Sequence, residues 1–333
     1  MQRLSDATIV ITGASSGVGR AAAKTFARSG ARVALAARRE ELLHNVAREC
    51  ERLGGHALAI PTDVTDAKAV RQLADIAADR LGPIRVWINN AGVGAVGRYT
   101  ETPIEAHRRV IETNLIGYMN GAHAVLPHFF AERQGILINN ISVGAWAPAP
   151  FAVAYAASKF GLAGFSESLR AELSGWPDIH ICDVFPFFLD TPGVQHGANY
   201  TGRVLQPAPP VYDPQRVADV MARLATRPKP RAVVGAPAFL VKLAHAAAPT
   251  ITGRIAAALL ELYLRQAAPA PVTDGNLFAP VAVGDTSHGG WQKQNRPLVA
   301  GALAASGVGA LGVLWAATRS KKIALAADRI IQN

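Results

Sequence analysis

The sequence has only two cysteines, Cys50 and Cys182, in 333 residues. Two cysteines cannot build the disulfide framework of a small secreted domain or the multi-cysteine ligand set of a structural zinc site. We therefore expect no metal, and two ordinary core thiols in a reducing compartment. The N-terminus also lacks the long apolar segment and the small-residue cleavage site of a signal peptide. Both absences favour a cytoplasmic catalytic domain.

Acidic residues are scarce in the C-terminal part. Residues 1–200 carry 19 Lys and Arg against 18 Asp and Glu, whereas residues 201–333 carry 15 against 6. Such an excess of positive charge can bind nucleic acid or an anionic membrane surface. The basic residues are interleaved with apolar runs and form no Lys/Arg-rich block with exposed aromatics. We therefore expect no nucleic-acid partner and favour a membrane surface.

Half of the residues are hydrophobic, and they follow an alternating pattern up to about residue 236. Continuous apolar runs, which are typical of strands buried on both faces, indicate strands. These runs cover residues 7–12, 31–37, 56–61, 84–89, 135–142, 179–185 and 231–235. Helical patterns lie between them at 17–29, 39–53, 66–81, 103–131, 153–174 and 214–226. This alternation predicts βαβ units, an α/β fold and a parallel sheet.

The pattern changes beyond residue 236. Residues 238–266 indicate two apolar or amphipathic helices separated at Pro249, and a Pro/Gly-rich connector follows. Residues 298–318 carry no charge and reach the roughly 20 residues that span a bilayer. Seven alanines and four glycines make this stretch only marginally apolar. We predict three regions: a catalytic domain at 1–236, a helical extension with connector at 237–297, and an apolar helix with a basic tail at 298–333.

The basic tail conflicts with a simple membrane span. Arg319, Lys321, Lys322 and Arg329 follow the apolar stretch, and basic residues favour the cytoplasmic side of a membrane. A single span cannot leave both this end and the catalytic domain in the cytoplasm. A tail anchor that ignores the charge bias, a helix pair entering and leaving one face, or an amphipathic region lying on the membrane are the open alternatives. We expect peripheral or tail-anchored attachment.

A glycine-rich turn, TGASSGVG at residues 12–19, follows the first predicted strand directly. Glycines there let the backbone turn tightly and approach a pyrophosphate, which would face the first amides of the next helix. The spacing T-G-x-x-x-G-x-G differs from the G-x-G-x-x-G of other dinucleotide folds. We predict cofactor binding by this turn, through Thr12, Gly13, Ser15, Ser16, Gly17, Val18 and Gly19.

No acidic residue ends the second predicted strand, where Arg38 and Arg39 stand instead. An acid at this place would bind the ribose 2′-hydroxyl of NAD, whereas a basic residue accommodates the 2′-phosphate of NADP. We therefore predict NADP(H) in preference to NAD(H). Arg38 is the main phosphate partner in this prediction, with Arg39 beside it and Ser15 as a helper.

The stretch AYAASKFG at residues 154–161 places Tyr155 and Lys159 four residues apart. In a helix this spacing puts both side chains on one face. The spacing alone does not distinguish a partly buried tyrosine from a proton-transfer pair.

In combination, these motifs resemble the short-chain dehydrogenase/reductase family over residues 5–235. The matching features, in the family's order, are TGASSGVG, Asp63-Val64 after the third strand, NNAG at 89–92, Asn114, Ser142 and YAASK at 155–159. The resemblance implies a Rossmann-type, doubly wound parallel sheet of about seven strands and an NAD(P)-dependent oxidoreductase. It also implies a homodimer or tetramer through the helices at 103–131 and 153–174.

The resemblance assigns roles to single residues. Asn114, Ser142, Tyr155 and Lys159 match the catalytic tetrad. Tyr155 would exchange the proton, Lys159 would lower its pKa and reach the nicotinamide ribose, and Ser142 would bind the substrate oxygen. Asn114 would hold a water that links Lys159 to solvent. Further implied cofactor contacts, besides Tyr155 and Lys159, are Asp63, Val64, Asn90, Ala91, Gly92, Pro186 and Thr191.

One departure from the family concerns the segment after the sixth strand. Phe187 stands where glycine is usual after Pro186. Together with Trp146, Phe151 and Phe188 it could form a hydrophobic wall for an apolar, lipid-like carbonyl or alcohol, although core packing explains aromatics equally well. The predicted substrate-binding residues are Ser142, Trp146, Tyr155, Phe187 and Phe188.

The leading hypothesis is therefore an NADPH-dependent reductase of an apolar ketone or aldehyde, or a dehydrogenase of a secondary alcohol, working near a membrane. One alternative is a reductase of 3-ketoacyl groups on a carrier protein, whose acidic surface the basic C-terminal part could meet. A second is a non-catalytic NADP-binding regulatory protein, against which the complete tetrad argues.

Overall fold

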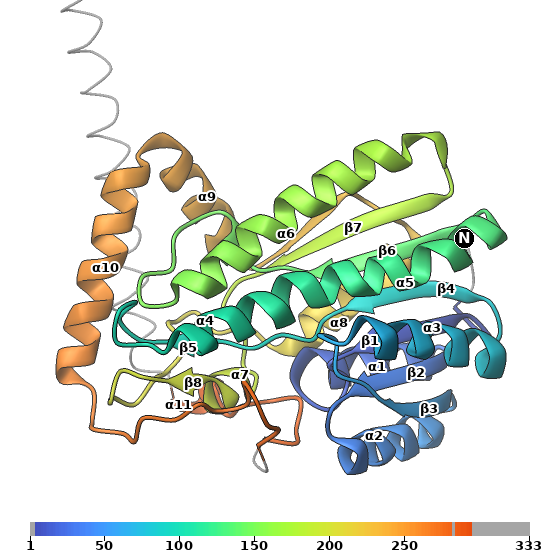
Figure 1. The fold of residues 1–333 in the computed structure, drawn as a ribbon, viewed down its shortest axis with the longest axis horizontal. Coiled ribbons are helices and arrows are strands. Elements are labelled where there is room, and N and C mark those ends of the chain that lie inside the picture. Colours follow the sequence, from blue (N-terminus) through green and yellow to red (C-terminus); the bar gives the residue numbers. More distant parts are fainter. Residues whose placement is uncertain (1–3, 282–283, 295–333) are drawn as a thin grey trace, which may run out of the picture.

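The structure, a computed structural model, describes residues 4–281 and 284–294 of the chain. Seven parallel strands form one sheet in the order β3-β2-β1-β4-β6-β7-β9, with helices on both faces (Figure 1). The strands are β1 (Thr8–Thr12), β2 (Arg32–Ala37), β3 (His56–Pro61), β4 (Ile84–Asn89), β6 (Gly135–Asn140), β7 (Ile179–Pro186) and β9 (Arg231–Val234). The predicted doubly wound α/β sheet of about seven strands is confirmed.

Two layers of helices cover this sheet. The helices α1 (Gly17–Arg28), α2 (Glu40–Arg52) and α8 (Pro214–Thr226) share one apolar cluster with one face of the sheet. The other face carries α3 (Ala67–Leu81), α4 (Ile104–Ile111), α5 (Gly117–Glu132) and α6 (Val153–Glu172). The strands bury both faces: Ile9 and Ile11 belong to the first cluster, whereas Val10 between them belongs to the second. This two-sided burial explains why the strands are continuously apolar in the sequence.

The long helix predicted over 103–131 is interrupted, and that prediction is wrong in this respect. A π-helical turn, η1 (Glu112–Ile116), separates α4 from α5. The turn contains Asn114, whose buried side chain accepts a hydrogen bond from the amide of Val93 at 2.8 Å and donates one to its carbonyl at 2.9 Å. The extra residue in a π-helical turn shifts the face that the helix presents, and such turns are frequent at functional sites.

Several short elements had no signal in the sequence. A second sheet pairs β5 (Ala95–Val96) with β8 (Ala198–Asn199), and α7 (Gly193–His196) precedes β8. Two 3-10 turns, η2 (Val143–Ala145) and η3 (Leu173–Gly175), flank α6. Strands of two residues are too short to show periodicity, so sequence reasoning could not find them.

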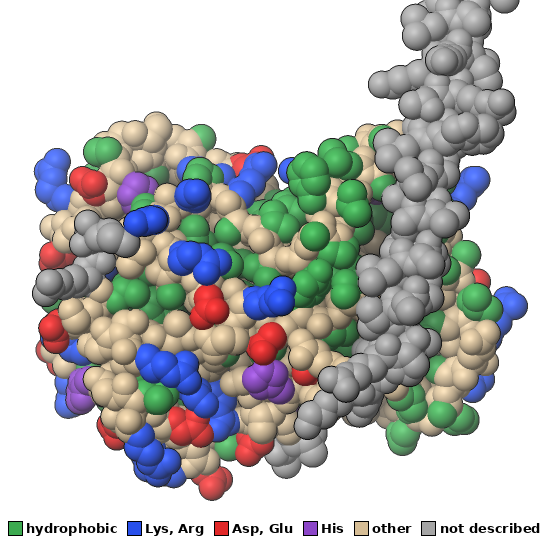
Figure 2. Space-filling model, turned by 180° about the vertical axis from the view of Figure 1, so that it is seen from behind, with side chains coloured by type: hydrophobic (Ala, Val, Ile, Leu, Met, Phe, Trp, Pro, Cys, Tyr) green, Lys and Arg blue, Asp and Glu red, His purple; other side chains and the backbone are tan. Residues whose placement is uncertain are grey.

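The extension after β9 forms two helices, α9 (Pro237–Ala247) and α10 (Pro249–Gln266), and later a short α11 (Trp291–Gln294). Pro249 is the first residue of α10, where its missing N–H costs no helical bond, so the predicted break is confirmed. None of the α10 residues is fully buried. Figure 2 shows hydrophobic side chains gathered on the face where α9 lies, and Phe239, Leu240 and Leu243 are at least half exposed there.

Within residues 4–281 and 284–294, no helix combines the length and the apolar character needed to cross a bilayer. The apolar stretch at 298–318 and the basic residues after it lie outside the described residues. Membrane attachment, the three-region division and the homodimer or tetramer therefore stay predictions.

A buried polar network joins α5 to the centre of the sheet. Asn89 on β4 accepts a hydrogen bond from Trp87 and donates to the Tyr118 carbonyl and to the Asn139 side chain, at 2.8 to 3.1 Å. Gly121 on α5 closes over this network. A Cβ at Gly121 would lie 2.2 Å from the Asn89 Oδ1 and 2.8 Å from the Trp87 Nε1, so α5 can approach the strand only where a glycine stands.

Two glycine-to-alanine substitutions test this packing. We expect Gly121→Ala to lower the free energy of unfolding by about 1–3 kcal/mol, because the added methyl group overpacks a rigid buried network. Gly164, in the interior of α6, has open space where its Cβ would lie. Gly164→Ala should therefore raise the free energy of unfolding by up to about 1 kcal/mol through helix propensity. Urea unfolding of both variants measures this, and equal effects would contradict the close approach of α5.

Candidate active site

The predicted site residues meet at one edge of the sheet. Parallel strands end on the same side, so the loops that follow them lie next to one another. The turn at 12–19 follows β1, Arg38 follows β2, Asp63 follows β3, Asn90 follows β4, Ser142 follows β6, and Pro186 ends β7. Residues spread over some 170 positions of the sequence thus share one edge.

The glycine turn packs directly against the segment after β4. A Cβ at Gly13, where φ is +67°, would lie 2.7 Å from the Ala91 Cα, and a Cβ at Gly19 would lie 2.2 Å from the Gly13 carbonyl oxygen. The Asn90 side chain donates to the Thr12 carbonyl at 3.0 Å, and the Asn90 backbone N–H donates to the Thr12 hydroxyl at 2.9 Å. Only glycine fits these positions, and the predicted cofactor residues Thr12, Gly13, Gly19, Asn90 and Ala91 do come together.

Arg38 and Arg39 are half-buried beside this turn. The Arg39 guanidinium donates to the Ser15 hydroxyl at 3.4 Å, so Ser15 lies beside the arginine pair. Burial lowers the pKa of both guanidinium groups, while the charge of Asp63 raises that of Arg38 and the charge of Asp285 raises that of Arg39. These donors face backbone carbonyls of the segment after α10.

Asp63 forms an ion pair that the sequence did not reveal. The Arg109 Nη2 donates to the Asp63 carboxylate at 2.7 Å, and the Arg109 Nη1 donates to the Thr65 hydroxyl at 2.8 Å. Burial raises the pKa of Asp63, but hydrogen bonds from Thr65 and Arg109 outweigh it and lower the pKa. Its neighbour Val64 packs against Gly117 at the start of α5. Arg109 is one of two adjacent arginines on α4, and no motif distinguishes them.

The four tetrad residues come together where η2, α6 and η1 meet. The Ser142 Oγ accepts a hydrogen bond from the Gly144 amide at 3.0 Å, and a Cβ at Gly144 would lie 3.2 Å from the Tyr155 ring. The Asn114 side chain reaches the hydroxyl of Ser158, the residue before Lys159, at 3.4 Å. The structure thus places the predicted tetrad in one site.

Lys159 is 4% exposed. Its Nζ donates to the Asn140 carbonyl at 3.3 Å and lies 5.2 Å from the centre of the Tyr118 ring and 5.6 Å from that of Tyr155. Burial lowers the pKa of Lys159 to about 7. Tyr118, whose hydroxyl donates to the same Asn140 carbonyl, is a buried neighbour that the sequence did not single out.

The pKa of Tyr155 shifts in the direction opposite to the prediction. We expected the Lys159 ammonium to lower it, but burial raises it, opposed only by a side-chain hydrogen bond with Ser142. Burial thus lowers the pKa of Lys159 to about 7 and raises that of Tyr155 above its ordinary value, so Lys159 loses its proton at a lower pH than Tyr155. It therefore gives the phenolate little positive charge in this geometry.

The predicted aromatic wall does not form one cluster. Trp146 stacks on Phe185, with ring centres 4.2 Å apart, and the Lys242 Nζ lies 4.7 Å from the Trp146 ring centre. Phe187 and Phe188 contact each other edge to face at 5.1 Å. Phe151 lies beneath the Arg98 guanidinium instead. Trp146 directly follows η2, which begins after Ser142.

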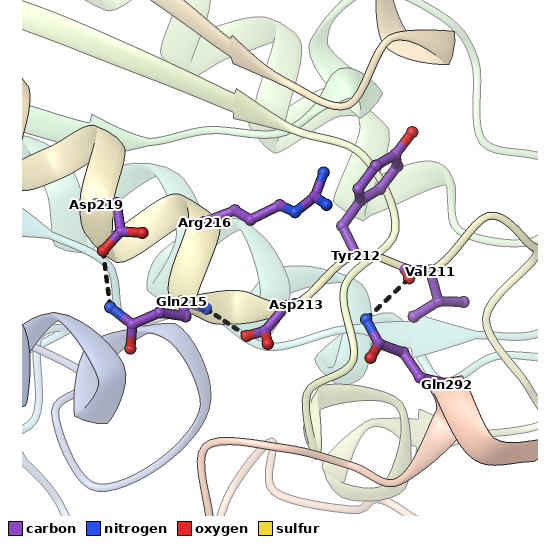
Figure 3. A pocket seen from close by; sticks show the side chains of 7 residues that line it. All are labelled: Val211, Tyr212, Asp213, Gln215, Arg216, Asp219 and Gln292. Carbon is purple, nitrogen blue, oxygen red and sulfur yellow. Dashed lines mark hydrogen bonds between the residues drawn. The ribbon is translucent and has the colours of Figure 1, made fainter.

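Thr191 also lies near the turn. A Cβ at Gly17 would lie 3.5 Å from the Thr191 side chain. No group of three or more potential metal ligands occurs in the described part of the chain. A hollow of about 470 Å³ lies at the start of α8, lined by polar groups that include Asp213, Arg216 and Gln292 (Figure 3). None of the tetrad residues lines it.

Comparisons with known proteins agree with this architecture. A model of the short chain dehydrogenase family matches residues 7–199. The uncharacterized oxidoreductase YxnA of Bacillus subtilis is 30% identical over 337 residues, which are 96% of this chain and 92% of the relative. The 1-deoxy-11-beta-hydroxypentalenate dehydrogenase of Streptomyces exfoliatus is 40% identical over 189 residues, which are 56% of this chain and 68% of that enzyme.

Two solved structures have the same fold. A metagenomic short-chain oxidoreductase in complex with NADP has a TM-score of 0.59 and 30% identity, and the match covers 70% of this chain and 98% of the other. An alcohol dehydrogenase from the archaeon Thermococcus sibiricus, complexed with 5-hydroxy-NADP, has a TM-score of 0.60 and 26% identity. That match covers 68% of this chain and 95% of the other. The sheet order, the shared edge and these matches identify the chain as an oxidoreductase that belongs to the short-chain dehydrogenase/reductase family.

Proposed function

We propose that this protein is an NADP(H)-dependent oxidoreductase that reduces the carbonyl group of an apolar ketone or aldehyde, with Tyr155 as the proton donor. The observation that carries the proposal is the meeting of Ser142, Tyr155, Lys159 and Asn114 at the carboxyl edge of the sheet. The complexes of two similar structures with NADP and 5-hydroxy-NADP support the choice of cofactor.

The donors at this edge suit a dinucleotide phosphate. Arg38 and Arg39 present guanidinium groups, Ser15 a hydroxyl, and the first turn of α1 its amides, all next to a turn in which only glycine fits. Such donors bind anionic oxygens, and no carboxylate at the end of β2 competes for the 2′-position. These residues would hold NADP(H), which supplies the hydride when bound.

The protonation states favour reduction. Burial keeps the Tyr155 hydroxyl protonated at neutral pH, because its pKa lies above the ordinary value. A protonated phenol can donate its proton to the oxygen of a carbonyl as negative charge develops there. The Ser142 hydroxyl, held by the Gly144 amide, can donate a second hydrogen bond to the same oxygen. Oxidation of an alcohol would instead need the phenolate, which burial disfavours.

The substrate class rests on the surroundings of the tetrad. Tyr155 packs against a buried cluster of apolar side chains that includes Val93, Ala95, Val110 and Ala154. A neutral, apolar carbonyl compound would lose little solvation there. Reduction of a carrier-bound 3-ketoacyl group and a non-catalytic NADP-binding role are the alternatives that the experiments below distinguish.

The first experiment replaces the proton donor. We expect Tyr155→Phe to lower turnover of NADPH with hydrophobic ketones and aldehydes by at least about 100-fold, since general acid catalysis contributes this much. The Kd for NADPH should stay within about threefold, because the ring is kept. Tyr99→Phe, at a tyrosine that is 55% exposed, is the matched control and should keep full activity.

Two outcomes contradict the mechanism. Full activity of Tyr155→Phe would exclude Tyr155 as the donor, and absence of turnover over a broad panel despite tight NADPH binding would favour the non-catalytic alternative. Activity confined to 3-ketoacyl thioesters would favour the carrier-bound alternative.

The second experiment tests the cofactor preference. We expect Arg38→Ala to raise the ratio of the Kd for NADPH to the Kd for NADH by about 10- to 100-fold, because a charge-assisted contact to the 2′-phosphate is lost. The ratio is measured because a change in access to the site affects both cofactors alike. Arg48→Ala, on the exposed part of α2, should leave the ratio unchanged. An unchanged ratio in Arg38→Ala would assign the 2′-phosphate to other residues.

A further inference from the structure

The segment after α10 returns to the cofactor edge of the sheet. We call residues 273–281 and 284–291 the strap. Figure 1 shows it leaving the lower end of α10 and running below β8 and α7 toward α11. The strap has no regular secondary structure before α11. It contacts the arginines of the cofactor edge mostly through its backbone carbonyls.

The first end of the strap is anchored beside β8. Thr273 and Asn199 exchange two backbone hydrogen bonds of 2.8 and 3.0 Å. The Tyr200 hydroxyl donates to the Asp274 carboxylate at 2.6 Å. The next anchor is Leu277, which is completely buried in the apolar cluster against which Tyr155 packs. The strap therefore contacts the same apolar cluster as the proposed proton donor.

Around Leu277, backbone carbonyls of the strap accept hydrogen bonds from arginines at the cofactor edge of the sheet. Arg38 donates to the carbonyls of Leu277 and Phe278, both at 3.3 Å, and to that of Asn276. Arg109, the partner of Asp63, donates to the Leu277 carbonyl at 3.0 Å. The guanidinium group predicted to bind the 2′-phosphate thus faces three carbonyl oxygens of the same chain.

The later part of the strap accepts hydrogen bonds from the other donors that are predicted to bind the cofactor. Arg39 donates to the carbonyls of Val281 at 3.2 Å and Gly284 at 3.5 Å. The amide of Gly17, in the turn predicted to bind the pyrophosphate, donates to the Thr286 carbonyl at 3.0 Å. Both places at which anionic oxygens of the dinucleotide would bind are therefore bonded to neutral oxygens of the strap.

The far end of the strap is anchored beside Thr191. The amides of Gly289 and Trp291 donate to the Asp190 carboxylate at 3.1 and 2.7 Å, and the Trp291 indole donates to the Thr191 carbonyl at 3.0 Å. Trp291 is 7% exposed. Just beyond it, the Gln292 side chain donates to the Val211 carbonyl at 3.3 Å, as Figure 3 shows.

We infer that the strap is an intramolecular competitor of the dinucleotide: its carbonyls take the donors of Arg38, Arg39 and Gly17, and it must leave them for NADP(H) to bind. The inference rests on the proposed NADP(H) function. A donor given to a carbonyl is not available to a phosphate, so the measured affinity is reduced by the fraction of molecules whose strap is open. The carbonyls are neutral and a phosphate is charged, so a bound cofactor forms the stronger hydrogen bonds and can displace them.

The test loosens the strap without changing any group that faces the cofactor. Leu277→Ala removes the buried side chain at one anchor, and Trp291→Ala removes that at the other, while all strap carbonyls remain. We expect each variant to bind NADPH tighter than wild type, with a Kd lower on the order of tenfold, because a lost core side chain favours the open strap. Phe278→Ala is the matched control, since this neighbouring side chain is 49% exposed, and it should leave the Kd unchanged.

Each result has a distinct meaning. Weaker NADPH binding in both anchor variants would show that the strap closes over the cofactor, and equal binding would show that it does not touch the site; either overturns the inference. If neither wild type nor any variant binds NADPH or NADH, the proposed function itself fails. The two anchors lie far apart in the strap, so one variant still tests the inference where the other does not fold.

Hydrogen exchange gives a second readout that does not depend on activity. The amides of Thr273, Asn276, Gly289 and Trp291 donate to groups outside the strap. Saturating NADPH should speed their exchange in the wild-type protein if the strap is displaced. Slower or unchanged exchange at these amides contradicts displacement, whereas amides of the β1 and β4 strands serve as the internal reference.

Discussion

The parallel register of β1, β4, β6 and β7 is the constraint on which the rest of the site depends. Ile11 pairs with Ile88, Asn89 with Asn139, and Asn140 with Val184, so the four strands end at the same edge of the sheet, where β7 extends past β6 to Pro186. Every loop that carries a candidate functional group starts from this edge. A shift of one strand by one residue would exchange its two buried faces and move its loop out of the site. The buried network of Asn89 and Asn139 holds this register at the centre of the sheet.

Burial is the dominant electrostatic influence at the tetrad. It raises the pKa of Tyr155 and lowers that of Lys159 to about 7, so both groups tend toward their neutral forms. A neutral phenol can donate its proton to the oxygen of a carbonyl group while that group is being reduced. The same burial opposes the ammonium–phenolate pair that the family resemblance implies for Tyr155 and Lys159.

The strap connects the C-terminal extension to the chemistry of the catalytic domain. Its carbonyls bond to arginines that stand some 240 residues earlier in the chain, and Leu277 is buried beside Tyr155. The extension therefore acts on the cofactor edge and not only on the outer surface. A segment rich in proline and glycine suits this role, since a chain without regular structure leaves its carbonyls free to meet side-chain donors.

The sequence by itself determined the sheet, the glycine turn and the arginines after β2. These features are local: a buried parallel strand must be continuously apolar, and a tight turn against a neighbouring backbone must contain glycine. Only the tertiary structure decided the π-helical turn at Asn114, the Arg109–Asp63 pair, the separation of the predicted aromatic wall and the direction of the Tyr155 pKa shift. It also decided the path of the strap. The reason is that these features depend on contacts between segments far apart in the chain, and on how deeply the fold buries each group, neither of which any local pattern encodes.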